Sequence, residues 1–341
     1  MQELYYVGLD VHKKMIAYCV KRADGHIVDE GKVRATRSAL TSWGSGRRGR
    51  WIVGLEATMF TGWIYDFLKP HTADIRVGHP YMIKAIVAGK KKSDRLDART
   101  LADLLRCDLF PTCYMAPEKT RELRRVLRHR NLLVTEATRL KNKTASLLME
   151  VGAEYSKGRL HSRRYFNELV GNLKEVPSSL LELLHLNRES MEIFERNQRR
   201  LVDELVCHPE LRTRVERLMS IAGVGEVTAL TWALEIGDPH RFRSVKKAVS
   251  YCGLCSGQKE SAGVSKRSPL SKQRNKHLQR ILVEAAKLAP RWNPQLAAVY
   301  ERERERGTNY NCATLAVARK LVAYLLCVDK TKKAFEPREV A

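Results

Sequence analysis

The chain has 341 residues, of which 44% are hydrophobic and 29% are charged, a composition that excludes a disordered protein and allows roughly two or three domains. Lys and Arg outnumber Asp and Glu by 62 to 38, so the formal net charge is +24 at pH 7. A surplus of this size must face solvent, where it attracts a polyanion. We expect nucleic acid and no membrane, because the basic residues are spread over loops and several helices and form no single amphipathic stripe.

The N-terminus and the cysteines indicate a cytoplasmic protein. The opening stretch MQELYYVGLD has neither the basic nor the apolar region of a signal peptide. No uninterrupted apolar stretch approaches the roughly 18–20 residues that a membrane span needs. The eight Cys lack framework spacing, and the closest pair, Cys252 and Cys255, lacks the second pair that a structural zinc site requires. We expect reduced thiols and a cytoplasmic location, associated with the nucleoid when the protein is bound to DNA.

Residues 1–115 alternate between strand and helix patterns. Alternating or apolar runs predict strands at 4–9, 15–21, 26–34, 51–55 and 75–78, the first three as an antiparallel meander. Helices are predicted around 61–69, 80–88 and 93–106. Three strands, followed by strands that alternate with helices, predict an α/β domain with a mixed sheet covered by helices.

Residues 116–208 predict a helical hairpin. Apolar residues repeat every seven positions from Val126 to Leu147, and a second seam of the same kind follows Pro177. Two long helices separated by a polar insert at 152–176 are typical of an antiparallel coiled coil. The seam can pack within the chain or against a second protomer, and the pattern does not choose between the two.

Residues 209–330 predict a mainly helical C-terminal domain, and 331–341 predict a charged tail. A loop rich in glycine and serine is expected at 251–263. A helix beginning near Ser271 is expected to follow it and to carry several basic residues. The predicted fold class is therefore α/β in the N-terminal part and all-α in the middle and C-terminal parts.

Four carboxylates stand out in the α/β domain. Asp10 and Glu56 each end an apolar, β-branched run, whereas Asp94 and Asp97 lie three residues apart on one face of a predicted helix. Four converging acids cannot all stay ionised without a counter-charge. Mg²⁺ takes hard oxygen ligands, and pairs of Mg²⁺ ions cleave phosphodiesters, so the acids predict a metal-dependent nucleic-acid enzyme with two Mg²⁺ ions. The structural alternative is that Asp94 caps its helix and Asp97 pairs with a neighbouring arginine.

Glycines and basic residues predict where nucleic acid binds. Gly223 and Gly225 lie between two helical segments, as in a helix-hairpin-helix, where a glycine turn lets backbone N–H groups approach a phosphate. The basic residues expected to contact a phosphate backbone are Arg47, Arg48, Arg50, Lys266, Arg267, Lys272, Arg274, Lys276 and Arg280. The alternative for the last six is an ordinary solvated basic face.

These segments together resemble one family, the DEDD insertion-sequence transposases. The segments similar to its N-terminal domain are GLDVHK at 8–13, LEAT at 55–58 and KSDRLDARTLA at 92–102. The segments similar to its C-terminal transposase domain are IAGVGEVTAL at 221–230, FRSVKKAVSYCGL at 242–254 and SAGVSKRSPLSKQRNKHLQRIL at 261–282. The resemblance covers about residues 8–330 and is weaker in the middle. It implies a ribonuclease H-like (RuvC-like) N-terminal domain, in which Asp10, Glu56, Asp94 and Asp97 bind the metal.

The resemblance also implies a serine nucleophile in the C-terminal domain. The family places this serine in a Ser-x-Gly stretch, which Ser261 fits best, while Ser256 lies nearby. Two departures bear on the shape of this loop: Pro269 stands where the family usually has glycine, and a second glycine is missing near Arg274.

We read His12, the other polar residue near Asp10 in the N-terminal domain, as a structural or phosphate-contacting residue and not as a metal ligand.

The function implied is that of an RNA-guided recombinase or transposase of an insertion sequence. It would cut and rejoin donor and target DNA through a covalent phosphoserine intermediate, with a structured non-coding bridge RNA as guide. The serine and the acids fall in different domains, so the resemblance implies a homo-oligomer, a dimer that becomes a tetramer at synapsis. Two alternatives stay open: a RuvC-like nuclease or junction resolvase that hydrolyses DNA with water, and a basic RNA- or DNA-binding protein whose acids are structural.

Overall fold

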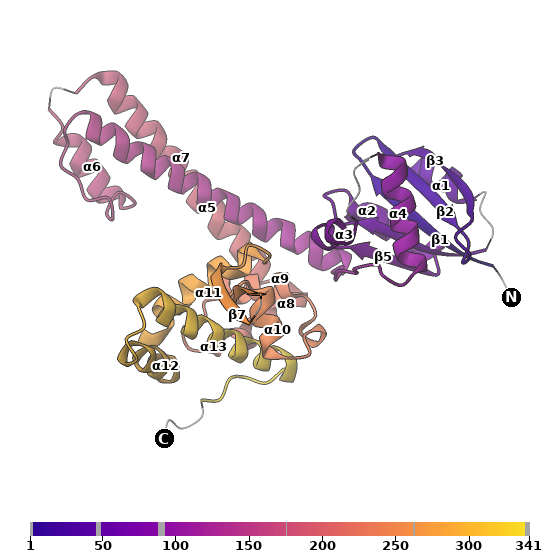
Figure 1. The fold of residues 1–341 in the computed structure, drawn as a ribbon. Coiled ribbons are helices and arrows are strands. Elements are labelled where there is room, and N and C mark those ends of the chain that lie inside the picture. The colour runs from indigo at the N-terminus through magenta and orange to yellow at the C-terminus, as the bar shows by residue number, and fades with distance from the viewer. Residues whose placement is uncertain (1–2, 46–48, 88–92, 175, 262, 338–341) are drawn as a thin grey trace. The chain divides into compact units, whose positions relative to one another are not determined.

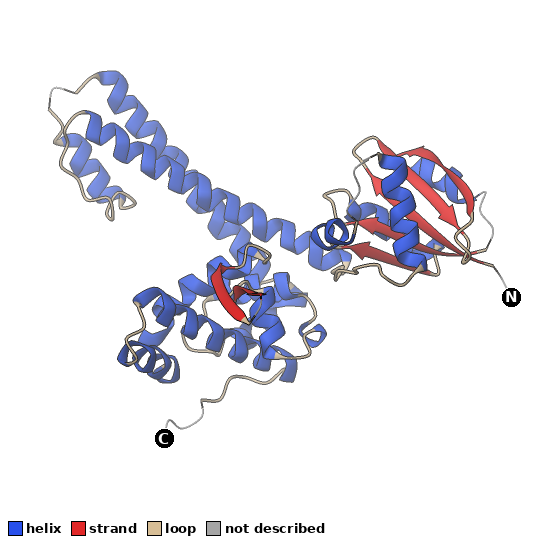
Figure 2. Ribbon diagram, viewed as in Figure 1, coloured by secondary structure: helices blue, strands red, loops and turns tan. Residues whose placement is uncertain are grey.

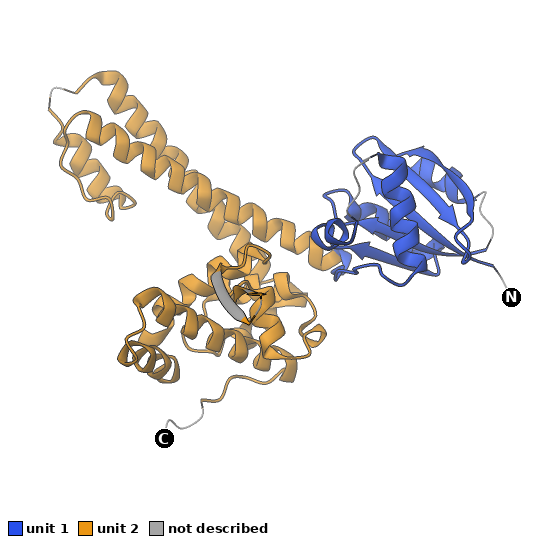
Figure 3. Cartoon of the chain, viewed as in Figure 1, with its two compact units in different colours: residues 1–118 blue, residues 119–341 orange. Residues whose placement is uncertain are grey.

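The structure is a computed structural model that describes residues 3–45, 49–87, 93–174, 176–261 and 263–337, with the backbone alone at position 259 and at 264–268. A mixed α/β region with a sheet precedes a mainly helical region, which confirms the predicted division of fold classes (Figure 1, Figure 2). The chain forms two compact units, Met1–Glu118 and Lys119–Ala341 (Figure 3).

Five strands form the sheet of the first unit. They are β1 (Leu4–Val11), β2 (Met15–Lys21), β3 (Ile27–Arg34), β4 (Arg50–Glu56) and β5 (Asp74–Gly78). Their spatial order is β3-β2-β1-β4-β5. The first three strands pair antiparallel, whereas β4 pairs parallel to both β1 and β5. All five predicted strands are present, and their pairing places β1 in the centre of the sheet.

Helices cover both faces of this sheet. They are α1 (Arg37–Ser45), α2 (Thr61–Leu68), α3 (Pro80–Ile86) and α4 (Asp94–Arg106), with the 3-10 helix η1 (Lys69–His71) after α2. Leu9 of β1 shares a core with Leu40 of α1 and Ile64 of α2. Cys19 of β2 packs with Ala98 of α4 in a separate cluster on the other face. The sequence pattern does not predict α1, because Leu40 is the one residue that this helix buries.

Two long helices open the second unit and lie alongside each other in Figure 1. They are α5 (Glu118–Glu150) and α7 (Ser178–Val206), at the two predicted positions. The stretch between them, expected to be a polar insert, also contains helix α6 (Arg163–Gly171). Phe166 of α6 is buried in a core that includes Leu148 of α5 and Leu184 of α7. This core explains why the insert is ordered around α6.

The remaining helices share one large core. They are α8 (Pro209–Met219), α9 (Glu226–Ile236), α10 (Val245–Tyr251), α11 (Lys276–Leu288), α12 (Pro294–Glu305) and α13 (Tyr310–Thr331), with the 3-10 helices η2 (Pro239–Arg241) and η3 (Ala289–Arg291). Trp232 of α9 and Leu321 of α13 are fully buried in it. Among the described helices, α13 alone is long and apolar enough to cross a membrane. Half of that apolar stretch is buried inside the protein, as in the core helix of a globular domain.

Two expectations for the C-terminal part are wrong. The stretch expected to be a loop enters an antiparallel hairpin, β6 (Ser256–Ser261) and β7 (Val264–Leu270). The helix expected to start near Ser271 starts at Lys276, because the side chain of Asn275 accepts hydrogen bonds from the first backbone N–H groups of α11. Lys272 and Arg274 therefore precede α11 and do not lie on it.

Candidate functional site

Strand pairing sets Asp10 and Glu56 side by side. Leu9 of β1 pairs with Leu55 of β4 in parallel register, so the next residue on each strand is an acid at the same edge of the sheet. Side chains alternate between the two faces of a strand, so Asp10 shares a face with Gly8, and Glu56 shares the same face with Gly54. Both carboxylates therefore emerge on the face that α4 covers.

Glycine lets α4 approach that face closely. A Cβ atom built on Gly8 would lie 2.1 Å from the carbonyl oxygen of Ala98, and one on Gly54 would lie 2.7 Å from Leu105 Cδ1. The N-terminus of α4 is held by Ser93, whose hydroxyl accepts a hydrogen bond from the Leu96 N–H. The first turn of α4 carries Asp94 and Asp97.

An Asp-His-Asp cluster forms where β1 ends and α4 begins. His12 Nε2 lies 3.0 Å from Asp10 Oδ2 and 3.5 Å from Asp94 Oδ1. Asp10, His12 and Asp94 can each offer one ligand atom within 4.8 Å of the others. Glu56 and Asp97 lie outside this group, although Asp97 is near enough to raise the pKa of Asp10.

The electrostatics of the cluster favour a cation. Burial raises the pKa of Asp10, His12 opposes that shift, and the charges of Asp97 and Asp94 add to it. Lys32 of β3 donates a hydrogen bond of 2.8 Å to Asp94 Oδ2 and lowers the pKa of that carboxyl. Two carboxylates and an imidazole at one point are a donor set that fits a divalent cation, and the carboxylate oxygens fit Mg²⁺.

The neighbouring arginines do not neutralise Asp97. Arg99 donates hydrogen bonds of 2.7 and 2.8 Å to the carboxylate of Glu30 on β3, and Arg95 pairs with the same carboxylate. These ion pairs fasten the first turns of α4 to β3. The alternative in which Asp97 pairs with an arginine of its own helix is therefore wrong.

Three further residues lie around the acids. His12, which the sequence predicts to be structural or phosphate-contacting, lies within the cluster. The sequence alone indicates no role for Lys32 or Glu30. The sequence signal available was their period-two spacing on one strand, and it could not reveal that β3 faces α4.

The two candidate serines lie at opposite ends of the hairpin of the second unit, and both are exposed. Ser261 pairs with Val264 at the tip, whereas Ser256 pairs with Leu270 at the base. Gly263 adopts a positive φ of 78° in the turn, a conformation that favours glycine. Exposure therefore does not separate the two serines, and Ser261 is the one at the tip of the hairpin.

The predicted glycine turn joins α8 to α9. Gly223 has a φ of 93°, and a Cβ there would lie 2.7 Å from the Cβ of Ala289. Gly225 is the N-cap of α9, and a Cβ there would meet open space. Gly223 thus has a packing role in the turn, while Gly225 lies at the exposed helix start.

The predicted basic residues fall in several places. Arg50 is exposed at the start of β4, and Lys276 and Arg280 are exposed on α11. Exposed Lys272 and Arg274 lie in the link between β7 and α11. Arg47 and Arg48 lie outside the described residues, and for Lys266 and Arg267 only the backbone, within β7, is described.

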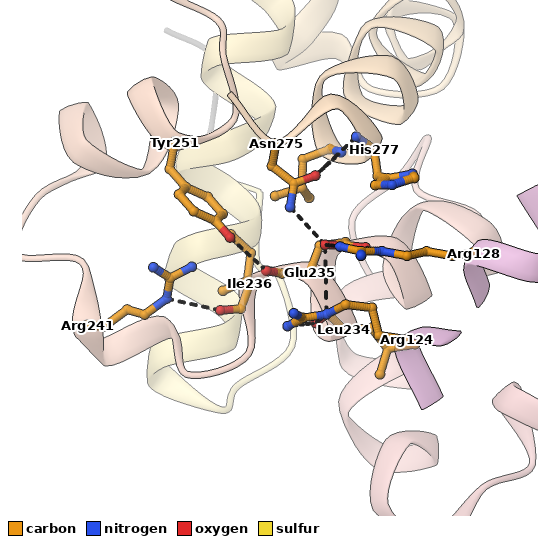
Figure 4. A network of polar contacts seen from close by, with 10 residues as sticks. Arg124, Arg128, Leu234, Glu235, Ile236, Arg241, Tyr251, Asn275 and His277 are labelled. Carbon is orange, nitrogen blue, oxygen red and sulfur yellow. Dashed lines mark hydrogen bonds and ion pairs between the residues drawn. The ribbon is translucent and has the colours of Figure 1, made fainter. Parts of the chain in front are cut away.

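A buried carboxylate that the sequence did not single out organises the base of α11 (Figure 4). The side chain of Glu235 on α9 is 1% exposed and accepts hydrogen bonds of 2.8 and 2.9 Å from Arg128 on α5. Asn275, the N-cap of α11, donates a further hydrogen bond of 2.8 Å to Glu235. Arg124 donates to the carbonyl of Leu234 at the end of α9. This network joins α5, α9 and α11.

Comparison with known proteins finds two family models along the chain. A model described as "Transposase", of the DEDD IS110 type, matches residues 7–152. A second, described as "Transposase IS116/IS110/IS902 family", matches residues 215–301. The four acids fall within the first match, and Ser261 falls within the second.

Curated relatives are similar over most of the chain. A putative transposase y4qE of Sinorhizobium fredii is 25% identical, over 95% of this chain and 88% of the relative. The transposase for insertion sequence element IS1111A of Coxiella burnetii is 24% identical, over 93% of this chain and 87% of the relative. A pilin gene-inverting protein of Moraxella bovis is 28% identical, over 39% of this chain and 42% of the relative.

Proposed function

Because this chain belongs to the IS110/IS116 family of transposases and is a DNA transposase or recombinase, we propose that it moves an insertion sequence by RNA-guided cutting and rejoining of DNA. The observation that carries the proposal is that one chain contains both features: an acidic cluster in the first unit and a serine at a hairpin tip in the second. Each of these features falls within one of the two family matches.

We assign the first unit to the ribonuclease H-like, RuvC-like fold. The strand order β3-β2-β1-β4-β5 and the acids at the ends of β1 and β4 support that assignment. Asp10, Glu56, Asp94 and Asp97 would hold two Mg²⁺ ions, and His12 is the further residue at the same point. Bound Mg²⁺ would neutralise charge on the attacked phosphate and on the departing oxygen.

The serine would act as a covalent nucleophile. Ser261 Oγ loses its proton and forms a bond to phosphorus, while the bond from phosphorus to the 3′ oxygen breaks and that oxygen takes up a proton. The product is a 5′-phosphoserine linkage and a free 3′-hydroxyl. The linkage conserves the energy of the phosphodiester, so a 3′-hydroxyl of another strand can attack it and rejoin the DNA without nucleotide hydrolysis.

Donor DNA, target DNA and a guide RNA are the proposed partners. The +24 charge, the glycine turn at Gly225 and the basic residues before and on α11 support binding to phosphate backbones. The acids and Ser261 belong to different units, so a dimer, and a tetramer at synapsis, would complete the site. We place the protein in the cytoplasm, at the nucleoid when it is bound to DNA.

Trapping the covalent intermediate tests this function. The protein is incubated with a nicked suicide substrate built from its own element ends, with the guide RNA and Mg²⁺, and linked peptides are identified by mass spectrometry. We expect DNA on Ser261, no linkage in Ser261→Ala, and unchanged linkage in Ser256→Ala. DNA on Ser256, or undiminished linkage in Ser261→Ala, would contradict the assignment.

The same experiment separates the hydrolytic alternative. The acidic cluster lies wholly in the first unit, as a RuvC-like nuclease or junction resolvase would require. Such an enzyme would release free, unlinked ends and would be indifferent to Ser261. Recombination that continues after the RNA has been removed would separately refute the proposal that an RNA guides the reaction.

A further inference from the structure

A cationic cavity of about 560 Å³ lies within the second unit, between α5, α9 and α11. Its polar lining includes Arg128, Arg130, Thr135, Lys276, His277 and Arg280. It is far larger than the roughly 30 Å³ that one water occupies in the liquid. The cavity can therefore accept a charged group together with the atoms attached to it.

The acids near this cavity are already paired. The buried Glu235 network neutralises Arg128, and Glu284, which itself lines the cavity, forms an ion pair of 3.0 Å with Lys287. Within the described part of the chain, neither Arg130 nor Arg280 has a carboxylate at ion-pair distance, nor does Lys276. Burial lowers the pKa of His277, which disfavours a positive charge on its ring. The cavity thus keeps an uncompensated surplus of positive charge.

Of these three cations, Arg130 is the one with a buried side-chain nitrogen that lacks a hydrogen-bond partner in the described structure. Its Nε is buried and has no hydrogen-bond partner, while one Nη donates to Asn131 Oδ1 at 3.2 Å. Burial lowers the pKa of Arg130, and the nearby charge of Arg280 lowers it further. Glu195 and Glu226 line a neighbouring cavity that Arg130 also borders, yet neither forms an ion pair with it in the described structure. Two arginines held close together without an anion are arranged to receive one.

We propose that this cavity binds a phosphate group of a nucleic-acid backbone, with Arg130 and Arg280 as its two principal ligands and Lys276 as a third cation. A guanidinium presents planar N–H groups that match phosphate oxygens, and a backbone phosphate supplies the missing acceptors. The contact carries no sequence information, so it would fix the position of a strand without selecting its bases. The choice of nucleic acid as ligand rests on the proposed function.

The cavity lies beside α11, whose start is connected by hydrogen bonds to the base of the serine hairpin. Asn275 holds the start of α11 to Glu235, and its backbone N–H donates to the carbonyl of Tyr251. The Ser271 N–H donates to the carbonyl of Cys255, at the base of the serine hairpin. A phosphate bound beside α11 would therefore be held at a fixed place relative to that base.

The test compares Arg130→Gln and Arg280→Gln with Arg302→Gln, which removes one exposed positive charge from α12 and serves as the matched control. Fluorescence anisotropy with a labelled DNA duplex and a labelled RNA hairpin, each across a range of KCl concentrations, gives affinity and salt slope. Each cavity variant should lose about tenfold in affinity for at least one probe, and its salt slope should fall by about one unit. The double variant should lose little more, because both arginines hold one phosphate.

Thermal unfolding distinguishes a binding role from a structural one. In chloride buffer both cavity variants should unfold at the wild-type temperature or above it, because each removes a repulsion between like charges. Inorganic phosphate should stabilise the wild type and Arg302→Gln more than the cavity variants. Loss on the DNA probe alone assigns the site to donor or target DNA, and loss on RNA alone assigns it to the guide.

Wild-type affinity and salt slope on both probes would overturn the proposal, as would stabilisation of the cavity variants by inorganic phosphate equal to that of the wild type. Tight binding of an acidic peptide in place of either nucleic acid would also overturn it. None of these readouts needs DNA cleavage. These assays can therefore disprove phosphate binding by the cavity without bearing on the recombinase assignment. That assignment is tested separately, by trapping the phosphoserine intermediate.

Discussion

At the scale of single residues, Asp10 lies where its charge is disfavoured. Burial raises the pKa of its carboxyl, His12 opposes the shift, and the neighbouring Asp97 and Asp94 add to it. A raised pKa means that the folded state holds the proton more tightly than the unfolded chain. The resulting stability is present at low pH and is lost as pH rises through the folded pKa. Ionised Asp10 therefore weakens the first unit at pH 7 when no cation is bound.

Replacing Asp10 with Asn should raise the thermal unfolding midpoint by a few degrees at pH 7 in the absence of divalent cations. The difference should shrink as pH falls through the raised folded pKa of Asp10 and should vanish below the ordinary value of 3.8, because wild-type Asp10 then carries its own proton in both the folded and the unfolded state. Added Mg²⁺ should stabilise the wild type and not the variant. Scanning calorimetry from acid to neutral pH measures both effects, and a variant that tracks the wild type at every pH would contradict this account.

At the scale of elements, the contact between β1 and α4 decides whether the acids meet. Gly8→Ala would place a methyl group 2.1 Å from the Ala98 carbonyl oxygen, so α4 would have to move. We expect a loss of at least about 1–3 kcal/mol in the free energy of unfolding and weaker stabilisation by Mg²⁺. Gly44→Ala is the control, because its methyl group would meet Trp51 at an ordinary 3.7 Å. In urea unfolding, Gly44→Ala should have the same free energy of unfolding as the wild type, and Gly8→Ala a lower one. Equal free energies of unfolding for the two variants would refute the role of Gly8.

The Glu235 network holds α5, α9 and α11 together by charge. Burial alone would raise the pKa of Glu235, but hydrogen bonds and charge from Arg128, with help from Asn275 and Arg124, lower it overall. A lowered pKa gives stability that is present above the unfolded value of 4.5 and is lost as pH falls through the folded value.

Glu235→Gln should therefore lower the free energy of unfolding by about 1.5–3 kcal/mol at pH 7, because it removes charge-assisted hydrogen bonds to a buried carboxylate while the Arg128 side chain, 45% exposed, keeps access to water. The loss should become smaller in acid, where wild-type Glu235 is itself protonated. Urea unfolding followed by circular dichroism at several pH values measures this. Glu210→Gln, at the exposed start of α8, is a suitable control and should change little. A Glu235→Gln protein as stable as that control at pH 7 would show that the network is dispensable.

At the scale of the whole molecule, the acids and the serine belong to different compact units. If a complete site needs two copies of the chain, an acid-deficient protein and a serine-deficient protein should complement each other. Mixing Asp94→Asn with Ser261→Ala should restore a measurable fraction of recombination that neither protein supports alone. Gel assays of donor and target joining measure it. No activity in the mixture, with both proteins folded and bound to DNA, would mean that each chain must carry both groups.

The amino-acid sequence by itself determined the positions of the five strands, the two long helices and the acids at the ends of β1 and β4. These features follow from period-two and period-seven patterns, which are local and can be read from a few neighbouring residues. The glycine turn between α8 and α9 was readable for the same reason.

Only the tertiary structure decided which residues surround those features. His12 and Asp94 meet because β1 lies in the centre of the sheet, and Glu30 and Lys32 contribute because β3 lies close to the start of α4. Glu235 and Arg128 are 107 positions apart, and Arg130 and Arg280 lie still further apart in sequence, on α5 and α11. Local patterns report the conformation of a segment, but contacts of this range depend on how whole elements pack, and that is a property of the folded chain.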